Sequence, residues 1–452
     1  MSEENSKYYP VVYEISSKND IFDFDEKPSF SKDIDYPKFS FGFQHFIHQS
    51  KTKMEITKEF EGKKKVYYII SQFERYIDDY DSDINNISKV YFDLDPKPNI
   101  LSRAFYKLWE LFFMFDIIDL KTEDFVSAHL AEGPGSFIQA TMFYRDKFSK
   151  KSKNDKYYAV TLHSEGFQKH IPKLEESFID YYKKEKPARF MMHKTFNTQE
   201  AGTSNRKDNG DLTNPKTIKI FGGNFDKKKA NLVTADGGFD WANENIQEQE
   251  AFKLILAQII TAVKIQEVGG SFVCKMYETF TQVSSKFISI LNSFYKNVYI
   301  IKPLMSRASN SEKYIVCLKF INHKDHNKRI SKLDNILAAM NNNKSNLVNI
   351  FPDFKITNEF KSHLIRANVD IENKQFVDIN RMITFINKQN FRGEEYVQRR
   401  QMQIDATKYW LDTFFPDGKD FDNKKNNIVN QTNDLISDNN NDAENLLKKL
   451  EF

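Results

Sequence analysis

The middle of the chain alternates short apolar runs with longer stretches in which apolar residues recur at helical spacing. The apolar runs predict six strands, at residues 125–130, 157–163, 232–235, 271–274, 298–301 and 314–318. The amphipathic stretches predict four helices, at residues 103–115, 137–144, 248–268 and 281–294. Alternation of this kind is typical of an α/β fold built on a mainly parallel sheet.

The regions on either side follow other patterns and divide the chain into residues 1–95, 96–325 and 326–452. Residues 1–95 predict a small α+β region, with apolar runs such as residues 65–70. The last part predicts mostly helix, with its most apolar pieces at residues 382–386 and 401–415. Within it, residues 423–442 are dominated by Asn and Asp, which predicts a flexible loop or tail.

The composition indicates a folded protein with a sizeable core, since 40% of the 452 residues are hydrophobic and 14% are aromatic. The net charge is only +3, but lysines cluster at residues 63–65, 147–156, 227–229 and 324–332. Such clusters suit a polyanionic partner such as a nucleic acid, and they also occur as ordinary solvated faces. Charge alone leaves both interpretations open.

Cellular context follows from what the sequence does not contain. The N-terminus is polar and acidic, unlike a signal peptide, and no apolar run reaches the roughly 18 residues of a membrane span. The two cysteines, Cys274 and Cys317, sit in apolar runs and predict buried reduced thiols. We therefore expect a cytoplasmic protein without a membrane segment. The histidine pairs, at residues 45 and 48 and at 323 and 326, lack further ligands, so we expect no metal.

Ionisable residues stand at the ends of three predicted strands. Asp236 follows residues 232–235, Lys275 follows residues 271–274, and Glu312 precedes residues 314–318. Ligands of open α/β sheets bind beyond the carboxyl ends of the strands, where Asp236 and Lys275 would meet. A partly desolvated lysine near other cations has a lowered pKa and can accept a proton. The alternatives are a turn-capping aspartate and a solvated lysine at a strand end.

A second candidate site is the turn Glu132-Gly133-Pro134-Gly135-Ser136-Phe137, which joins a predicted strand to a predicted helix. Its glycines allow close approach of a ligand, and the helix N-terminus offers free N–H groups. The third glycine of a dinucleotide fingerprint is absent, so a nucleoside ligand such as S-adenosylmethionine fits better. An ordinary β–α turn is the alternative.

Together these segments resemble the FtsJ-like ribose 2′-O-methyltransferases, most closely the cap-specific branch found in large cytoplasmic DNA viruses. The resemblance covers about residues 96–325 and rests on residues 102–110, 131–135, 210–214, 232–238, 272–275 and 302–312. It implies a Rossmann-like methyltransferase sheet, mostly parallel, with seven strands and an antiparallel edge hairpin, and with N- and C-terminal extensions.

The resemblance also implies the chemistry and the residues that perform it. The cofactor would be S-adenosylmethionine, with no metal, and the partner would be RNA, specifically the 5′ end of capped mRNA, with a capping-machinery protein as a possible further partner. Lys275 would activate the ribose 2′-OH while Lys107 and Asp236 set its pKa, the two lysines depressing each other's pKa, and Glu312 orients the groups. The implied catalytic residues are Lys107, Asp236, Lys275 and Glu312. The implied cofactor-binding residues are Glu132, Gly133, Pro134, Gly135, Ser136, Phe137, Asp211 and Asp236, with Asp211 near the adenine.

Some positions depart from the family pattern or leave the function open. Ser136 stands where many relatives have glycine, residues 196–209 look like an insertion, and Glu165 is a candidate partner of the cofactor ribose. Lys302 and Arg307 could contact RNA phosphates, while Tyr106 and Trp109 could stack on a base, although Trp109 suits a core position better. A non-catalytic RNA-binding or assembly subunit, or methylation of ribosomal or transfer RNA, are the alternatives.

Overall fold

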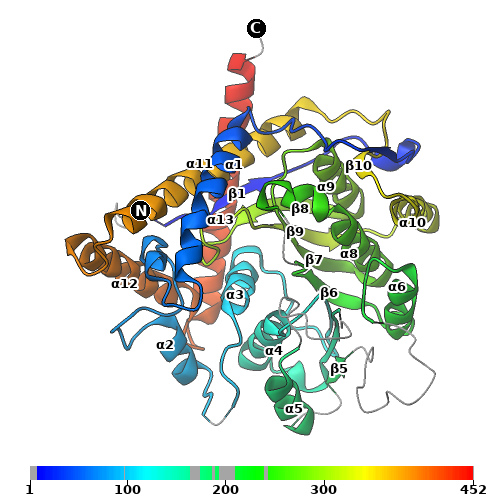
Figure 1. Cartoon of the computed structure of the whole chain (residues 1–452). Coiled ribbons are helices and arrows are strands. Elements are labelled where there is room, and N and C mark those ends of the chain that lie inside the picture. The colour runs from blue at the N-terminus through cyan, green and yellow to red at the C-terminus, as the bar shows by residue number, and fades with distance from the viewer. Residues whose placement is uncertain are drawn as a thin grey trace, which may run out of the picture.

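The computed structural model of the chain describes residues 8–95, 97–162, 174–185, 189–192, 209–238 and 243–450. Its centre is an eight-stranded mixed sheet with the order β1-β8-β9-β7-β6-β3-β4-β5 (Figure 1). The strands are β1 (Val11–Glu14), β3 (Val126–Leu130), β4 (Lys156–Val160), β5 (Phe190–Met192), β6 (Ala230–Ala235), β7 (Gln266–Met276), β8 (Tyr295–Lys302) and β9 (Lys313–Phe320).

The pairing directions confirm the predicted fold class. Five strands run parallel to one another, in the order β5, β4, β3, β6 and β7. Strand β9 then pairs antiparallel with both β7 and β8. All six predicted strands are present, and β5 and β1 are additional. Strand β1 pairs antiparallel with β8, so a segment from the N-terminal extension adds an eighth strand to the sheet.

The strand order reverses between β3 and β6. From β3 the chain proceeds to β4 and β5 on one side, whereas β6 leads to β7 on the other. Helices leave the carboxyl ends of the two adjacent strands in opposite directions at such a switch point, which opens a crevice for ligands. The segments that follow β3 and β6 therefore border the crevice.

Helices cover both faces of the sheet and bury two large apolar clusters (Figure 1). The predicted helices are found as α3 (Arg103–Phe115), α4 (Ser136–Phe148) and α9 (Gln282–Phe294). The predicted helix at residues 248–268 is shorter than expected: α7 (Gln247–Glu250) and α8 (Phe252–Ile265) precede β7, which already begins at Gln266. The remaining helices of this region are α5 (Glu176–Glu185) and α6 (Pro215–Gly222).

The two extensions pack on this core and on each other. N-terminal helices α1 (Phe43–Lys53) and α2 (Ile84–Tyr91) are joined by 3₁₀ turns, and the apolar run at residues 65–70 forms one of them, Val66–Ile70. Strand β2 (Ser29–Ser31) pairs with β10 (Asn346–Asn349) of the C-terminal region. The C-terminal helices are α10 (His326–Asn342), α11 (Asn358–Lys388), α12 (Glu394–Phe414) and α13 (Phe421–Leu450).

The predicted flexible segment at residues 423–442 is wrong, because these residues lie inside the helix α13. Apolar residues at helical spacing, among them Ile428 and Ile436, are buried against the core. Asn439 and Asn440 donate hydrogen bonds to backbone carbonyls of β1, at 2.9 and 3.0 Å. The asparagines that suggested a loop therefore satisfy an otherwise open strand edge.

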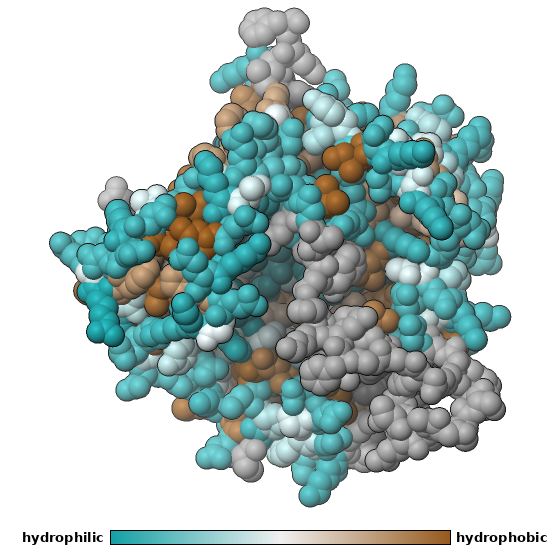
Figure 2. Space-filling view, viewed as in Figure 1, coloured by the Kyte–Doolittle hydropathy of each residue, from teal (hydrophilic) through white to brown (hydrophobic). Residues whose placement is uncertain are grey.

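Further observations on the described residues concern the cysteines, the lengths of the helices and the groups of possible metal ligands. Both cysteines are unpaired and buried, as predicted. No described helix is long and apolar enough to cross a membrane. Within the part of the chain that the structure describes, no group of three or more His, Cys, Asp or Glu side chains could hold a metal ion. On the face seen in Figure 2, hydrophilic residues cover most of the described surface, and hydrophobic ones form separate patches.

Helix α12 is joined to α3 by a buried tryptophan. Trp410 has no exposed surface, and its ring packs on Tyr106 and Phe414 at centroid distances of 5.7 and 5.2 Å. Its indole N–H lies 3.3 Å from the Glu110 carboxylate of α3. The C-terminal extension is therefore part of the same apolar core as α3.

We expect Trp410→Ala to lower the free energy of unfolding by about 3–5 kcal/mol, because it leaves a large cavity in a close-packed core. Urea denaturation monitored by circular dichroism measures this change. Val397→Ala, at an exposed position of the same helix, is the control and should change stability by less than about 0.5 kcal/mol. Equal effects of the two substitutions would show that α12 is not part of the core.

Candidate active site

The structure brings the four predicted catalytic residues together beyond the carboxyl ends of β6 and β7. They form two ion pairs: Lys107 Nζ lies 2.5 Å from Glu312 Oε1, and Lys275 Nζ lies 3.1 Å from Asp236 Oδ1. Lys275 also donates to the Asp236 backbone carbonyl at 2.9 Å. All four side chains are at most one-fifth exposed, so the pairs are strongly desolvated.

Each side chain reaches this place from a different element. Lys107 comes from the middle of α3, and Asp236 is the first residue after β6. Lys275 lies in β7 directly opposite Tyr314 of β9, and Glu312 immediately precedes β9. Because the parallel strands end at one edge, residues far apart in sequence meet within hydrogen-bonding distance.

Electrostatics in the cluster differ from the prediction in one respect. Burial alone would lower the pKa of Lys275, but Asp236, Tyr277 and Glu312 outweigh burial and raise it above its usual value. The expectation that neighbouring lysines depress the pKa of Lys275 is therefore wrong, because two carboxylates face it as well. Burial would raise the pKa of Glu312, yet Lys107, Lys275 and Lys302 hold it well below its usual range.

Two tyrosines that the sequence analysis did not select complete the surroundings of Asp236. The Tyr314 hydroxyl donates to Asp236 Oδ1 at 3.1 Å, and the Tyr277 hydroxyl donates to the Gly237 carbonyl at 3.1 Å. A Cβ at Gly238 would lie 2.6 Å from the Tyr277 hydroxyl and 3.3 Å from Lys275 Nζ. The glycine therefore leaves room for both groups. The sequence contained a signal for both tyrosines. Tyr277 follows Lys275 by two residues and Tyr314 follows Glu312 by two, and residues two apart in a strand lie on the same face.

The loop between β8 and β9 holds Glu312 in place. Ser306 Oγ donates to Glu312 Oε1 at 2.8 Å, and Lys302 Nζ donates to the backbone carbonyls of Glu312 and Asn310, at 2.5 and 2.7 Å. Burial, assisted by the nearby Lys313 and Lys107, lowers the pKa of Lys302 to about 7. The lysine with a lowered pKa is therefore Lys302, whose hydrogen bonds support the loop.

A buried carboxylate ties this loop to α3. Glu110 lies almost one helical turn beyond Lys107, and its two oxygens accept the backbone N–H groups of Leu304 and Met305, at 2.7 and 3.2 Å. The side chain is fully buried. One helix thus carries Lys107 and also sets the position of the loop that presents its partner Glu312.

The predicted cofactor turn joins β3 to α4, but two of the helix N–H groups that were expected to be free are bonded within the turn. Glu132 lies two residues after the end of β3. Its Oε1 accepts hydrogen bonds from the N–H groups of Phe137 and Ile138, at 2.8 and 2.9 Å, and so caps the N-terminus of α4. Its Oε2 is buried without a hydrogen-bond partner among the described residues. Gly135 has a φ of 114°, a conformation that favours glycine. The unpartnered oxygen suits a ligand that carries an N–H donor.

Two further predicted cofactor residues have structural roles of their own. Ser136 Oγ lies 2.7 Å from Ser102 Oγ, the N-cap of α3, so its hydroxyl links α4 to α3. Asp211 lies beyond the end of β4, where its Oδ1 accepts hydrogen bonds from Thr213. A Cβ at the preceding Gly210 would lie 2.0 Å from the Thr161 carbonyl, so the chain passes very close to that strand end. Glu165 and residues 196–208 lie outside the described residues.

The other sequence hypotheses resolve as follows. Trp109 is fully buried in the core, as predicted, and Tyr106 is also fully buried, so neither ring can stack on RNA in this structure. Arg307 pairs with Glu74, at 2.6 and 3.1 Å. The described histidines of the two pairs bond to protein groups, for example His48 to Glu278 at 3.1 Å and His323 to the Ser293 carbonyl at 2.6 Å.

Comparison with known proteins agrees with this geometry. A family model described as FtsJ-like methyltransferase matches residues 100–320. The chain carries an FtsJ-like methyltransferase domain. The match includes β3 to β9, the four paired residues and the turn at residues 132–137, and it excludes both extensions.

Several similar curated proteins are named as cap-specific mRNA methyltransferases. Cap-specific mRNA (nucleoside-2′-O-)-methyltransferase 1 of Mus musculus is 36% identical over 168 residues, covering 35% of this chain and 20% of the relative. The Homo sapiens protein of that name is 28% identical over 299 residues, covering 59% and 32%. Cap-specific mRNA (nucleoside-2′-O-)-methyltransferase 2 of Drosophila melanogaster is 29% identical over 273 residues, covering 59% and 36%. The chain thus spans about a fifth to a third of the length of these relatives.

In the FtsJ-like domain, we expect Glu110 to make stability depend on pH. Burial raises its pKa from the usual 4.5 to about 7, although three hydrogen bonds oppose the shift. The folded state then keeps a proton that the unfolded chain has lost, so the contribution is present below pH 4.5 and lost as pH rises through about 7. Relative to Glu110→Gln, the wild-type free energy of unfolding should fall by about 3 kcal/mol over this window.

Urea denaturation of both proteins at a series of pH values measures this difference, in which the other titrating groups cancel. Glu61→Gln, at an exposed carboxylate, is the control and should give a curve parallel to that of the wild type. Parallel curves for Glu110→Gln as well would contradict the raised pKa.

Proposed function

We propose that the chain is an S-adenosylmethionine-dependent RNA ribose 2′-O-methyltransferase that acts on the first transcribed nucleotide of capped mRNA. The observation that carries the proposal is the pair of desolvated ion pairs, Lys107 with Glu312 and Lys275 with Asp236, at the switch-point edge of an FtsJ-like domain. The names of the three relatives described above, cap-specific mRNA 2′-O-methyltransferases, support the choice of substrate.

The crevice between β3 and β6 suits the cofactor. The turn at residues 132–137 would hold its methionine part, Asp211 its adenine side, and Asp236 would border both cofactor and substrate. The unpartnered Glu132 Oε2 and the glycine conformation at Gly135 favour this assignment. S-adenosylmethionine would supply a methyl group on a sulfonium centre, and the residues of the chain would position the hydroxyl that receives it.

The raised pKa of Lys275 determines how the residues would act on the hydroxyl. At neutral pH the ammonium group can donate a hydrogen bond to the 2′ oxygen and fix its direction, which supplies much of the acceleration in a transfer reaction. To accept the hydroxyl proton, Lys275 must first lose one of its own. The neutral amine is scarce while Asp236 and Glu312 stabilise the ammonium, so the transfer rate should follow its population.

Glu312 and Lys107 act on this step through charge and position. Glu312 lies between the lysines and compensates the positive charge of Lys107 by direct contact. Without Glu312, Lys107 and Lys302 would remain buried and uncompensated close to Lys275. The ion pair of Lys107 with Glu312 therefore stabilises the arrangement in which Lys275 and Asp236 face the substrate hydroxyl.

We expect Lys275→Ala to reduce methyl transfer to capped, N7-methylated RNA by at least about 100-fold, because it removes the group that orients and deprotonates the hydroxyl. Radiolabelled S-adenosylmethionine measures the incorporation. Lys296→Ala, at an exposed lysine of β8, is the matched control and should retain wild-type activity. An uncapped RNA of the same sequence tests the substrate.

The outcomes separate the candidate functions. Equal incorporation into capped and uncapped RNA would exclude cap specificity and favour another RNA substrate. No incorporation by wild type or variant, together with retained RNA binding, would favour a non-catalytic RNA-binding subunit.

A second expectation concerns pH. Because the pKa of Lys275 is raised, the single-turnover rate should increase with pH across the range from about 6 to 9 without reaching a plateau. Asp236→Asn removes a carboxylate that raises this pKa, so its profile should rise at lower pH, with a reduced maximum. A rate that does not depend on pH, or an unshifted profile in Asp236→Asn, would rule out Lys275 as the proton acceptor.

A further inference from the structure

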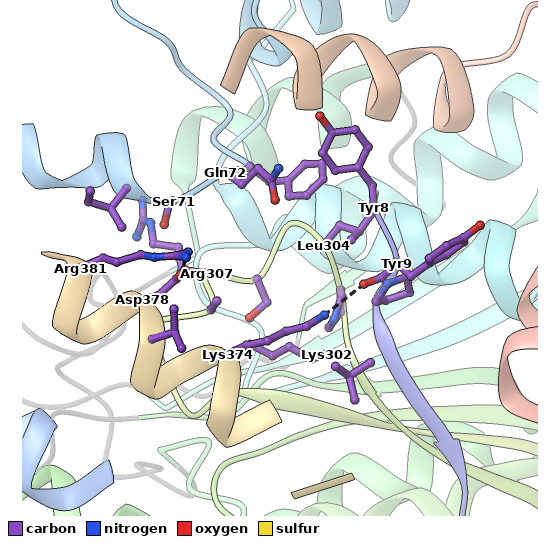
Figure 3. A pocket seen from close by; sticks show the side chains of 18 of the residues that line it. Tyr8, Tyr9, Ser71, Gln72, Lys302, Leu304, Arg307, Lys374, Asp378 and Arg381 are labelled. Atoms are coloured by element: carbon purple, nitrogen blue, oxygen red, sulfur yellow. Dashed lines mark hydrogen bonds and ion pairs between the residues drawn. The ribbon is translucent and has the colours of Figure 1, made fainter. Parts of the chain in front are cut away.

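A cavity of about 340 Å³ lies next to the ion pairs, on the far side of the loop between β8 and β9. Five segments enclose it: the residues leading into β1, the turn at residues 70–73, the loop itself, and one face each of α11 and α12 (Figure 3). The residues on α11 and α12 lie beyond the 100–320 family match, so the extensions supply much of this wall.

The cavity has an excess of positive charge. Its lining includes five basic side chains and one carboxylate: Lys302, Arg307, Lys374, Arg381, Arg399 and Asp378. Four of the five bases are cations at neutral pH, and Lys302, with its pKa of about 7, is partly charged. Lys374, Asp378 and Arg381 are spaced by four and three residues on α11, so they project from one face of the helix (Figure 3). A single carboxylate cannot compensate this number of cations.

Most of these cations lack a close acidic partner. Lys302 bonds only to neutral oxygens of Asn310 and Glu312. Arg381 comes no closer to Asp378 than 3.8 Å, and Arg399 no closer to Glu395 than 3.9 Å. Neither guanidinium has a hydrogen bond to any of the described residues, so their planar donor arrays remain available for phosphate or carboxylate oxygens. Arg307, by contrast, is already paired with Glu74.

Ser71 and Tyr9 also line the cavity. Ser71 is buried in its wall, and the Ser71 hydroxyl has no hydrogen-bond partner among the described residues. The partly exposed Tyr9 lies at another side, where its backbone carbonyl accepts a hydrogen bond from Lys374 at 3.3 Å (Figure 3).

The cavity and the ion pairs share residues. Lys302 and Ser306 both line the cavity, and both donate hydrogen bonds to Glu312. An anion bound beside Lys302 would therefore be separated from the ion-pair cluster only by the Lys302 side chain, which contacts Glu312. The cluster faces the proposed target ribose. This link favours a part of the RNA substrate over an unrelated acidic ligand.

We infer that this cavity binds phosphate groups of the RNA strand whose ribose reaches the ion pairs, with Arg381 and Arg399 as its principal contacts. The inference rests on the proposed function for its choice of ligand. The phosphates belong either to the 5′ polyphosphate end or to internal phosphodiesters, which offer the same oxygens to the two guanidinium groups.

The test measures RNA binding directly, so it does not depend on methyl transfer. Fluorescence anisotropy of a short, 3′-labelled single-stranded RNA compares the full-length wild type with the double variant Arg381→Gln/Arg399→Gln. We expect about tenfold weaker binding, and a dependence on salt concentration that is shallower by about 0.7 in slope for each lost phosphate contact. Arg381→Lys/Arg399→Lys keeps the charge and should restore part of the affinity.

Two controls separate a local effect from misfolding or general charge loss. Arg392→Gln removes one exposed cation of the same extension outside the cavity and should leave RNA affinity unchanged. S-adenosylmethionine binding by calorimetry should be the same in wild type and in the double variant, because neither arginine borders the cofactor crevice.

RNAs that carry a 5′ triphosphate or a 5′ hydroxyl identify the source of the phosphates. Loss of affinity for the triphosphate RNA alone assigns the cavity to the 5′ end, and equal loss for both assigns it to internal phosphodiesters. Unchanged affinity for both RNAs would overturn the inference. If the wild type binds RNA through these arginines and transfers no methyl group, the inference stands and the proposed activity fails.

Discussion

The structure depends on the contact between Glu312 and the buried lysines around it. Lys107 touches this carboxylate directly, while Lys275 and Lys302 lie close enough for all three to lower its pKa. Buried cations without a counter-charge cost several kcal/mol each, so the strand edge cannot hold three lysines without acidic partners. Glu312 and Asp236 together compensate the charge of the cluster, and the loop between β8 and β9 positions Glu312.

Helix α3 connects the ion-pair cluster to the loop between β8 and β9 and to the C-terminal extension. Lys107 binds Glu312 on one side of the loop, and Glu110 holds the backbone of the same loop from one turn further along. Glu110 also accepts the indole N–H of Trp410, which connects α12 to the site. The C-terminal extension is thus joined to the chemistry by buried polar contacts, and the same extension supplies the arginines of the neighbouring cavity.

The pKa of Lys275 shows how much depends on the complete set of neighbours. Counting lysines in the sequence predicts mutual depression of their pKa values, whereas the folded arrangement places Asp236 and Glu312 near the same ammonium group. The depressed pKa belongs to Lys302, which is buried against neutral oxygens and two other lysines. Residue types at strand ends indicate a reactive site, but the sign of each shift follows from distances that the sequence does not contain.

The sequence pattern determined the α/β core and the strand-end members of the ion-pair cluster, Asp236, Lys275 and Glu312, whereas the family resemblance added Lys107. Hydrophobic periodicity depends only on local order along the chain, which is why α3 and the six strands were found, and acids and lysines at strand ends must meet at one sheet edge. Only the tertiary structure decided the rest. Strand β1 joins the sheet through pairing across almost 300 residues, and the Asn-rich segment packs as the helix α13, with two of its asparagines bonded to that strand. Tyr277, Tyr314 and Glu110 acquire their roles from contacts made in three dimensions, as do the arginines of the cavity. Contacts of this kind join distant segments, and no local pattern of residues records them.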